Sequence, residues 1–167
     1  MDLAFDVVVI GGGHAGTEAA HAAAMVLRAG GGGRVALVTG ASRGLGFAMA
    51  RALADQGAMV VLNGRDATTL AARQSDIEAA GGRAAIAAFD VCDRQTADAA
   101  IDDIVARFGK LDILINNAAF GVPRDFFDIS DDDWRLSMNV ALDSCFRLSR
   151  KAAAGMAARG WGRIIMI

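Results

Sequence analysis

The chain has 167 residues, 54% of them hydrophobic, and a formal net charge of −2. This length and composition suffice for one domain with an apolar core. The slightly acidic charge gives no basic surface for nucleic acid, and no apolar run approaches the ~20 residues that cross a membrane. The N-terminus is acidic where a signal peptide would be basic, so we expect a cytoplasmic protein.

Two cysteines and two histidines are the candidate redox groups and soft metal ligands of the chain. Cys92 and Cys145 lack C-x-x-C or histidine spacing, so we expect two reduced, buried thiols. His14 and His21 are seven residues apart, whereas a metal-binding pair on a helix needs a spacing of four. The sequence therefore predicts no metal site.

The chain begins with an apolar, strand-like run over residues 6–10, followed by Gly11-Gly12-Gly13-His14-Ala15-Gly16 and an alanine-rich helical pattern over residues 17–27. The G-x-G-x-x-G spacing after a strand is typical of dinucleotide binding. Residues 4–27 resemble the start of the FAD domain of the tRNA uridine 5-carboxymethylaminomethyl modification enzyme. Because no second strand follows, FAD binding is not expected, and the segment is interpreted as a structural addition or a loosely attached arm.

Four glycines at residues 30–33 predict a flexible linker after this N-terminal βα segment of residues 1–29. The glycine turn of the following domain, residues 34–167, has a different spacing, which argues against internal duplication. We therefore expect a chimera, natural or artificial, joined between Leu27 and Arg34.

The strongest motif is Thr39-Gly40-Ala41-Ser42-Arg43-Gly44-Leu45-Gly46, between an apolar run and a helical pattern. Its glycines allow a sharp turn and let a pyrophosphate approach the backbone, while the helix N-terminus offers free N–H groups. The motif predicts a dinucleotide site. The motif residues expected to bind the cofactor are Gly40, Ser42, Arg43, Gly44, Leu45 and Gly46.

Strand and helix patterns alternate from this motif to the end of the chain. Strands are expected over residues 35–38, 59–62, 84–89, 113–115 and 164–167, and helices over residues 47–55, 67–80, 96–108 and, after a Ser130 cap, to about residue 158. Strands separated by helices of this length imply right-handed crossovers and a parallel sheet.

The spacing G-x-x-x-G-x-G behind a threonine resembles the short-chain dehydrogenase/reductase family, and the chain supports this resemblance from about Arg34. The run over residues 61–66 looks most like the gluconate 5-dehydrogenase branch. The resemblance implies an incomplete, Rossmann-like α/β fold: a doubly wound parallel sheet of strand order 3-2-1-4-5, plus the extra N-terminal βα unit. The place of the extra strand does not follow from the sequence, and one option is the edge beside the last strand.

The resemblance also implies a nicotinamide cofactor. An NAD-binding relative would place a carboxylate where Gly64 stands. Arg65 follows and, together with Arg43, could meet a 2′-phosphate, so NADP is favoured over NAD. Asp66 is expected to cap the next helix instead. The alternative is that both arginines are solvated surface residues.

Two further segments come directly after predicted strands. The resemblance implies that Asp90 and Val91 border the adenine, and that Asn116-Asn117-Ala118-Ala119, similar to the family's N-N-A-G, lines the cofactor pocket. The alternatives are ordinary capping and turn residues. The cofactor residues expected beyond the glycine motif are Asn63, Arg65, Asp90, Val91, Asn117, Ala118 and Ala119.

The family's chemistry requires a serine that polarises the carbonyl, a tyrosine acid/base and a lysine four residues later. The chain has no tyrosine and stops where relatives carry the serine. Asn139 is the one remaining member of the catalytic set, implied to bend the long helix and hold a water. We therefore expect an NADP-dependent oxidoreductase for alcohols or ketones that is inactive as this truncated chain.

Two alternatives stay open. The chain could be a non-catalytic NADP(H)-binding or interaction module, or a chimeric, truncated product without a selected function. The partners expected are the dinucleotide, an alcohol or ketone substrate in a full-length form, and a second copy of the chain through the helix over residues 131–158. Nucleic acid and membranes are not expected.

Overall fold

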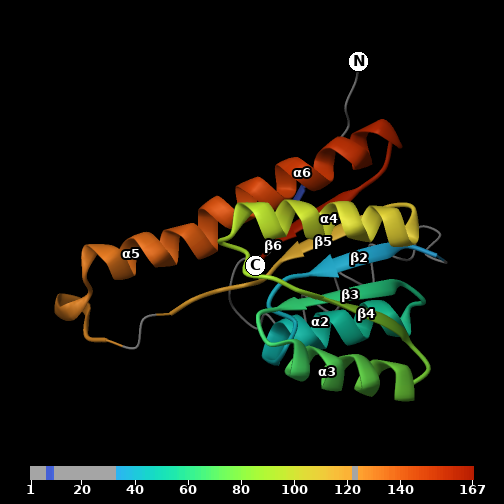
Figure 1. The fold of residues 1–167 in the computed structure, drawn as a ribbon, viewed down its shortest axis with the longest axis horizontal. Coiled ribbons are helices and arrows are strands. Elements are labelled where there is room, and N and C mark those ends of the chain that lie inside the picture. The colour runs from blue at the N-terminus through green and yellow to red at the C-terminus, as the bar shows by residue number, and fades with distance from the viewer. Residues whose placement is uncertain (1–6, 10–32, 122–123) are drawn as a thin grey trace.

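The computed structural model describes residues 7–9, 33–121 and 124–167 (Figure 1). Their elements, in chain order, are β1 (Val7–Val9), β2 (Val35–Val38), α2 (Gly44–Asp55), β3 (Met59–Gly64), α3 (Ala67–Ala79), β4 (Arg83–Ala88), α4 (Arg94–Phe108), β5 (Ile113–Asn116), the 3-10 turn η1 (Phe126–Asp128), α5 (Asp131–Met138), the π-helical turn η2 (Asn139–Asp143), α6 (Ser144–Ala158) and β6 (Arg163–Met166).

Within the described residues, six strands form one parallel sheet in the order β1-β6-β5-β2-β3-β4. The five strands from β2 onward have the predicted order 3-2-1-4-5. The extra strand β1 lies at the edge beside β6, with Val8 opposite Ile165. The sequence left its position undetermined because main-chain pairing at an edge leaves no side-chain pattern.

Helices cover both faces of the sheet, α2 and α3 on one and α4 and α6 on the other (Figure 1). The alternation of side chains along β2 explains this arrangement. Ala36 and Val38 belong to the cluster with α2 and α3, whereas Val35 and Leu37 belong to the cluster with α4 and α6. β2 is buried on both faces and is apolar at every position, as the sequence indicated.

Among the described helices, α3, α4 and α5 have side-chain caps at their N-termini. Asp66 accepts a hydrogen bond from the N–H of Thr68, which confirms its predicted capping role. Asp93 caps α4 in the same way. Ser130 and Asp133 form a capping box at the start of α5, so the acidic residues there favour a helix N-terminus.

The long helix predicted from residue 131 to about residue 158, with a bend implied at Asn139, is divided into α5, η2 and α6. The hydroxyl of Ser144 donates to the carbonyl oxygen of Val140 at 2.6 Å inside the irregular stretch. Such hydroxyl bonds compete with regular helix geometry. Beyond this turn, α5 extends away from the layers and buries none of its residues (Figure 1).

Several expectations fall on residues that the structure does not describe: the helix over residues 17–27, the first glycine turn, and the histidines His14 and His21. In the described ranges, no helix is both long and apolar enough to cross a membrane. The same ranges contain no cluster of histidine, cysteine and carboxylate side chains that could hold a metal ion. Cys92 and Cys145 are free, and both are half-buried rather than fully buried.

Candidate functional site

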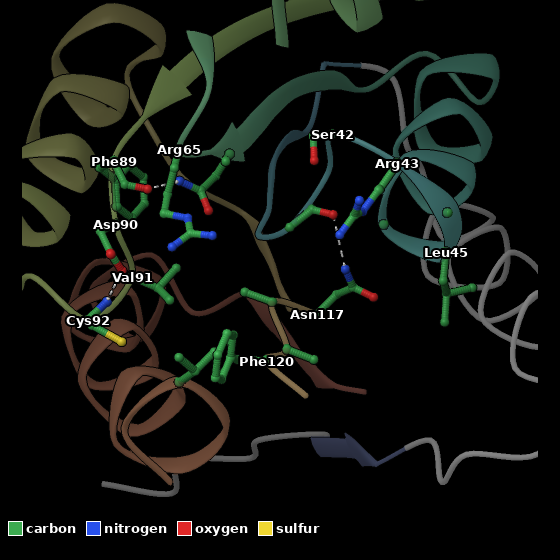
Figure 2. A pocket seen from close by; sticks show the side chains of 18 of the residues that line it. Ser42, Arg43, Leu45, Arg65, Phe89, Asp90, Val91, Cys92, Asn117 and Phe120 are labelled. Atoms are coloured by element: carbon green, nitrogen blue, oxygen red, sulfur yellow. Dashed lines mark hydrogen bonds between the residues drawn. The ribbon is translucent and has the colours of Figure 1, made fainter. Parts of the chain in front are cut away.

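A cavity of about 420 Å³ lies where β2, β3, β4 and β5 end (Figure 2). Because parallel strands all end at the same side of the sheet, the residues that follow them meet there. Every residue that the sequence predicts for the cofactor site lines this cavity: Gly40, Ser42, Arg43, Gly44, Leu45, Gly46, Asn63, Arg65, Asp90, Val91, Asn117, Ala118 and Ala119. The lining is completed by Gly64, Phe89, Cys92, Phe120, Leu136 and Val140.

Two glycines of the motif have conformations or neighbours that exclude other residues. Gly40 has a φ of +65°, which side chains rarely adopt. A Cβ on Gly46 would lie 2.3 Å from the carbonyl oxygen of Gly40 and 2.5 Å from Nδ2 of Asn117. The turn after β2 can therefore pack closely against the end of β5 only with glycine at both positions.

The N-terminus of α2 opens onto the cavity without a capping side chain. Its N-cap residue, Arg43, is extended and its side chain makes no capping hydrogen bond, unlike the caps of α3, α4 and α5. The first N–H groups of a helix have no intrahelical acceptor, and the helix dipole makes this end positive. The site can therefore accept an anion on main-chain N–H groups.

Two asparagines fix the walls of the cavity. The side-chain amide of Asn117 donates to the carbonyl oxygens of Thr39 at 3.0 Å and Gly40 at 3.4 Å, which ties the end of β5 to β2. Asn63 is almost fully buried, and its Nδ2 donates to the carbonyl oxygens of Ala87 and Phe89 at 3.1 and 3.0 Å. Its amide nitrogen thus holds the end of β4 beside β3.

The segment Asp90–Cys92 forms one side of the cavity. The carboxylate of Asp90 accepts a hydrogen bond from the N–H of Cys92 at 2.9 Å, which closes a tight turn. Burial of the thiol, together with the negative charge of Asp90, raises the pKa of Cys92. The thiol is therefore protonated near neutral pH and is a poor nucleophile.

Two exposed arginines lie at the mouth of the cavity. Figure 2 shows Arg65 on the side of Asp90 and Val91, and Arg43 on the side of Ser42 and Leu45. Neither guanidinium has an ion-pair partner within the described part of the chain. The position after Asn63 is Gly64, so no carboxylate competes with an anion there.

The short chain dehydrogenase family model matches residues 34–167. The chain belongs to this family. The match does not extend to residues 1–33, so the resemblance of the N-terminal segment to an FAD enzyme gains no support and stays a prediction.

Individual members of the short-chain dehydrogenase family are similar over the same part of the chain. Gluconate 5-dehydrogenase of Gluconobacter oxydans is 44% identical over 138 residues, which cover 81% of this chain and 53% of the relative. The reductase FabG of Vibrio cholerae, which acts on 3-oxoacyl-acyl-carrier-protein by its name, is 38% identical, with 81% and 54% covered. The chain thus spans about half the length of these curated relatives.

Solved structures of short-chain dehydrogenases share the fold. A metagenomic short-chain oxidoreductase in complex with NADP has a TM-score of 0.77 and 38% identity, with 81% of this chain and 62% of that chain covered. A gluconate 5-dehydrogenase from Burkholderia cenocepacia in complex with NADP and tartrate has a TM-score of 0.75 and 40% identity, with 81% and 53% covered.

The structure places Asn139, the residue predicted for the family's catalytic set, outside the cavity wall. It begins the π-helical turn η2, and its side-chain oxygen accepts a hydrogen bond from Nη2 of Arg147 at 2.8 Å. The helix is irregular at this asparagine, as the resemblance implied. Its side-chain oxygen is thus engaged by Arg147, and Asn139 is not among the residues that line the cavity.

Sequence reasoning missed several lining residues. Phe89 and Cys92 flank the predicted pair Asp90 and Val91, so adjacency could have identified them. Leu136 and Val140 reach the cavity from α5 and η2, and no motif marks them. Their contribution depends on where the long helix passes over the sheet, which local sequence does not encode.

Proposed function

We propose that this chain binds NADP(H) in the cavity at the ends of β2–β5, as the cofactor-binding part of an oxidoreductase of the short-chain dehydrogenase/reductase type. The observation that carries this proposal is the uncapped N-terminus of α2, where Gly44 has no neighbour within 4 Å of the position that a Cβ would take. Two similar structures were solved in complex with NADP, which supports a nicotinamide dinucleotide as the ligand.

The lining residues fit the adenosine half of such a cofactor. N–H groups around Ser42 and Leu45 would hold the pyrophosphate, and Asp90 and Val91 would border the adenine. Arg65 and Arg43 would meet the 2′-phosphate. NADP is favoured over NAD because Gly64 supplies no carboxylate for the ribose, and because Asp66 is engaged in capping α3.

We propose that residues 34–167 form the dinucleotide-binding domain, with residues 1–29 appended through the glycines at 30–33. The nicotinamide ring of the bound cofactor would supply or accept the hydride. In the family, transfer to an alcohol or ketone needs a serine and a tyrosine with its lysine, and these 167 residues contain no tyrosine. We therefore expect cofactor binding without turnover from the 167-residue chain, and Asn139 stays the one predicted catalytic residue.

A titration of the purified chain with NADPH, followed by nicotinamide fluorescence, tests the cofactor. We expect a micromolar dissociation constant for NADPH, binding of NADH that is about tenfold or more weaker, and no binding of FAD. Absence of NADPH binding, or equal affinity for NADH, would contradict the proposal. Turnover of any alcohol with NADP+ would contradict the expected inactivity.

A matched pair of variants tests the contact to the 2′-phosphate. Arg65→Ser should weaken NADPH binding about tenfold while leaving NADH binding unchanged, because only NADPH carries the additional phosphate. Arg51→Ser is the control, since Arg51 is an exposed arginine of α2 that does not line the cavity. An equal effect of both variants would show that only general charge attraction is involved.

A further inference from the structure

The guanidinium group of Arg147 joins two segments that are distant in sequence. Its Nη2 donates to the side-chain oxygen of Asn139 at 2.8 Å and lies 3.4 Å from the carbonyl oxygen of Cys92. The first contact reaches the π-helical turn η2, and the second reaches the loop between β4 and α4. Nε of Arg147 is buried and has no hydrogen-bond partner in the residues described here.

Both segments belong to the walls of the cavity, although Arg147 itself does not line it. Asp90, Val91 and Cys92 form one wall, and Val140, the neighbour of Asn139, belongs to another. The peptide groups of Cys92 are held on two sides, because its N–H donates to Asp90 and its carbonyl oxygen faces Arg147. The position of the Asp90 carboxylate is therefore coupled to Arg147.

The neighbouring basic residues of α6 make different contacts. Arg150 stacks over the exposed ring of Phe146, with 5.2 Å between the guanidinium carbon and the ring centroid. Lys151 pairs with Asp102 of α4. Arg147 is thus the basic side chain of α6 that contacts segments of the cavity wall. Its charge also acts on the Cys92 thiol, whose pKa it lowers against the larger effects of burial and of Asp90.

We propose that Arg147 is a positioning residue for the dinucleotide site. Its guanidinium group holds the adenine-side wall, Asp90–Cys92, against η2. This inference rests on the proposed function, because it assigns the wall to the adenine half of NADP(H). An arginine suits the task because one planar guanidinium group can donate to two acceptors in fixed directions. Loss of these contacts frees the loop, so that the ligand must order it on binding.

The test compares Arg147→Met and Arg147→Lys with the control Arg150→Met. The probes are NADPH and 2′,5′-ADP, which represents the adenine side alone. We expect Arg147→Met to bind both probes about tenfold more weakly, Arg147→Lys to lie between it and the wild type, and Arg150→Met to bind as the wild type does. Amide hydrogen exchange should accelerate at residues 91–93 in Arg147→Met and remain unchanged in β2 and β5.

A double-mutant cycle tests whether Arg147 acts through its bridge. Asn139→Leu removes one acceptor, and we expect its effect on 2′,5′-ADP affinity to be smaller in the Arg147→Met background than alone. Fully additive effects would overturn the bridging role. Unchanged affinity and exchange in Arg147→Met would overturn the proposal, as would a lower melting temperature without a change in either.

Failure of the proposed function gives a different result. If the wild-type chain binds neither NADPH nor 2′,5′-ADP, the cavity is not a site for these ligands. Arg147 then cannot be a positioning residue for such a site. Hydrogen exchange then still reports whether Arg147 orders the loop. Normal binding by the wild type with normal binding by Arg147→Met rejects the role of Arg147 alone.

Discussion

Thr39 and Asn117 exchange hydrogen bonds across the two central strands, at the floor of the cavity. The hydroxyl oxygen of Thr39 accepts from the main-chain N–H of Asn117 at 2.9 Å and from that of Ala118 at 3.0 Å. Asn117 donates back from its side-chain amide to the carbonyl oxygen of Thr39. Thr39 is 1% exposed, so water does not replace these partners. The exchange fixes the ends of β2 and β5 relative to each other.

Replacing Thr39 by valine should therefore destabilise the domain. Thr39→Val keeps the shape of the side chain but leaves two N–H groups without an acceptor, and we expect a loss of about 3 kcal/mol in the free energy of unfolding. Urea denaturation followed by circular dichroism measures it. Thr39→Ser retains the hydroxyl and should lose less than about 1.5 kcal/mol. Equal stability of the valine variant and the wild type would show that the hydrogen bonds accepted by the Thr39 hydroxyl contribute nothing to the free energy of unfolding.

The fold of residues 34–167 could be predicted because its strands contain short apolar runs and its helices end at recognisable signals. β2 was predicted with its observed ends, and β5 was predicted one residue short. The predicted cavity residues could be identified for a topological reason, since each lies at the carboxyl end of a strand or in the segment that directly follows it. Ser42, Asn63 and Asp90 thus meet although they are far apart in the chain.

The features that sequence did not predict depend on tertiary contacts, which no local sequence pattern indicates. The π-helical turn interrupts a sequence with ordinary helical periodicity. The bridge from Arg147 to Cys92 spans 55 residues and uses a carbonyl oxygen, which every residue possesses. Likewise, the pairing of β1 with β6 is a main-chain pairing between distant segments, with Val7 opposite Ile164. Each follows from packing of the whole domain rather than from a short stretch of sequence.

The stability of the domain should fall in acid because capping aspartates lose their charge. The capping aspartates have pKa values below the ordinary range, because neighbouring side chains donate hydrogen bonds to their carboxylates. The donors are Thr69 for Asp66, Thr96 for Asp93 and Ser130 for Asp133. A pKa that is lower in the folded state gives stability that is present above the unfolded-state pKa and is lost as the pH falls through the folded-state value. We expect the melting temperature to decline as the pH falls below about 4.

Variants with asparagine at these caps isolate this effect. Asparagine still accepts the capping hydrogen bond but does not titrate in this range. The triple variant of Asp66, Asp93 and Asp133 should therefore show a shallower decline of the melting temperature between pH 5 and pH 3 than the wild type. Asp55→Asn, at the exposed end of α2, should leave the decline unchanged. If the melting temperatures of the wild type and the triple variant decline in parallel with pH, the three capping aspartates are not the cause of the acid sensitivity.

Removal of β1 should change the association of the chain. The pairing of Val7–Val9 with β6 covers main-chain N–H and carbonyl groups that would otherwise form an open sheet edge. Exposed edges pair with other chains. Deletion of residues 1–10 should therefore produce larger species than the wild type, in proportions that rise with concentration. Size-exclusion chromatography with light scattering measures the mass.

A variant of full length distinguishes the effect of lost strand pairing from the effect of deleting ten residues. Val8→Pro removes a main-chain donor and disfavours pairing in the middle of β1. It should behave as the deletion does, whereas Val8→Thr should behave as the wild type. A deletion variant of unchanged mass and unchanged urea midpoint would mean that β1 does not protect the edge.

The homo-oligomer expected through residues 131–158 has a testable surface on η2 and α6. Leu142 and Phe146, one turn apart, are 63% and 60% exposed, and such exposed apolar pairs favour burial against a partner. We expect the wild type to be a dimer at micromolar concentration and the variant with Leu142→Glu and Phe146→Glu to be a monomer, because glutamates at an apolar interface would be buried without partners. Ala71→Glu, on the exposed side of α3 across the sheet, is the control and should remain dimeric. A monomeric wild type would contradict the expected dimer, and a glutamate variant that is still dimeric by sedimentation would place the interface on another surface.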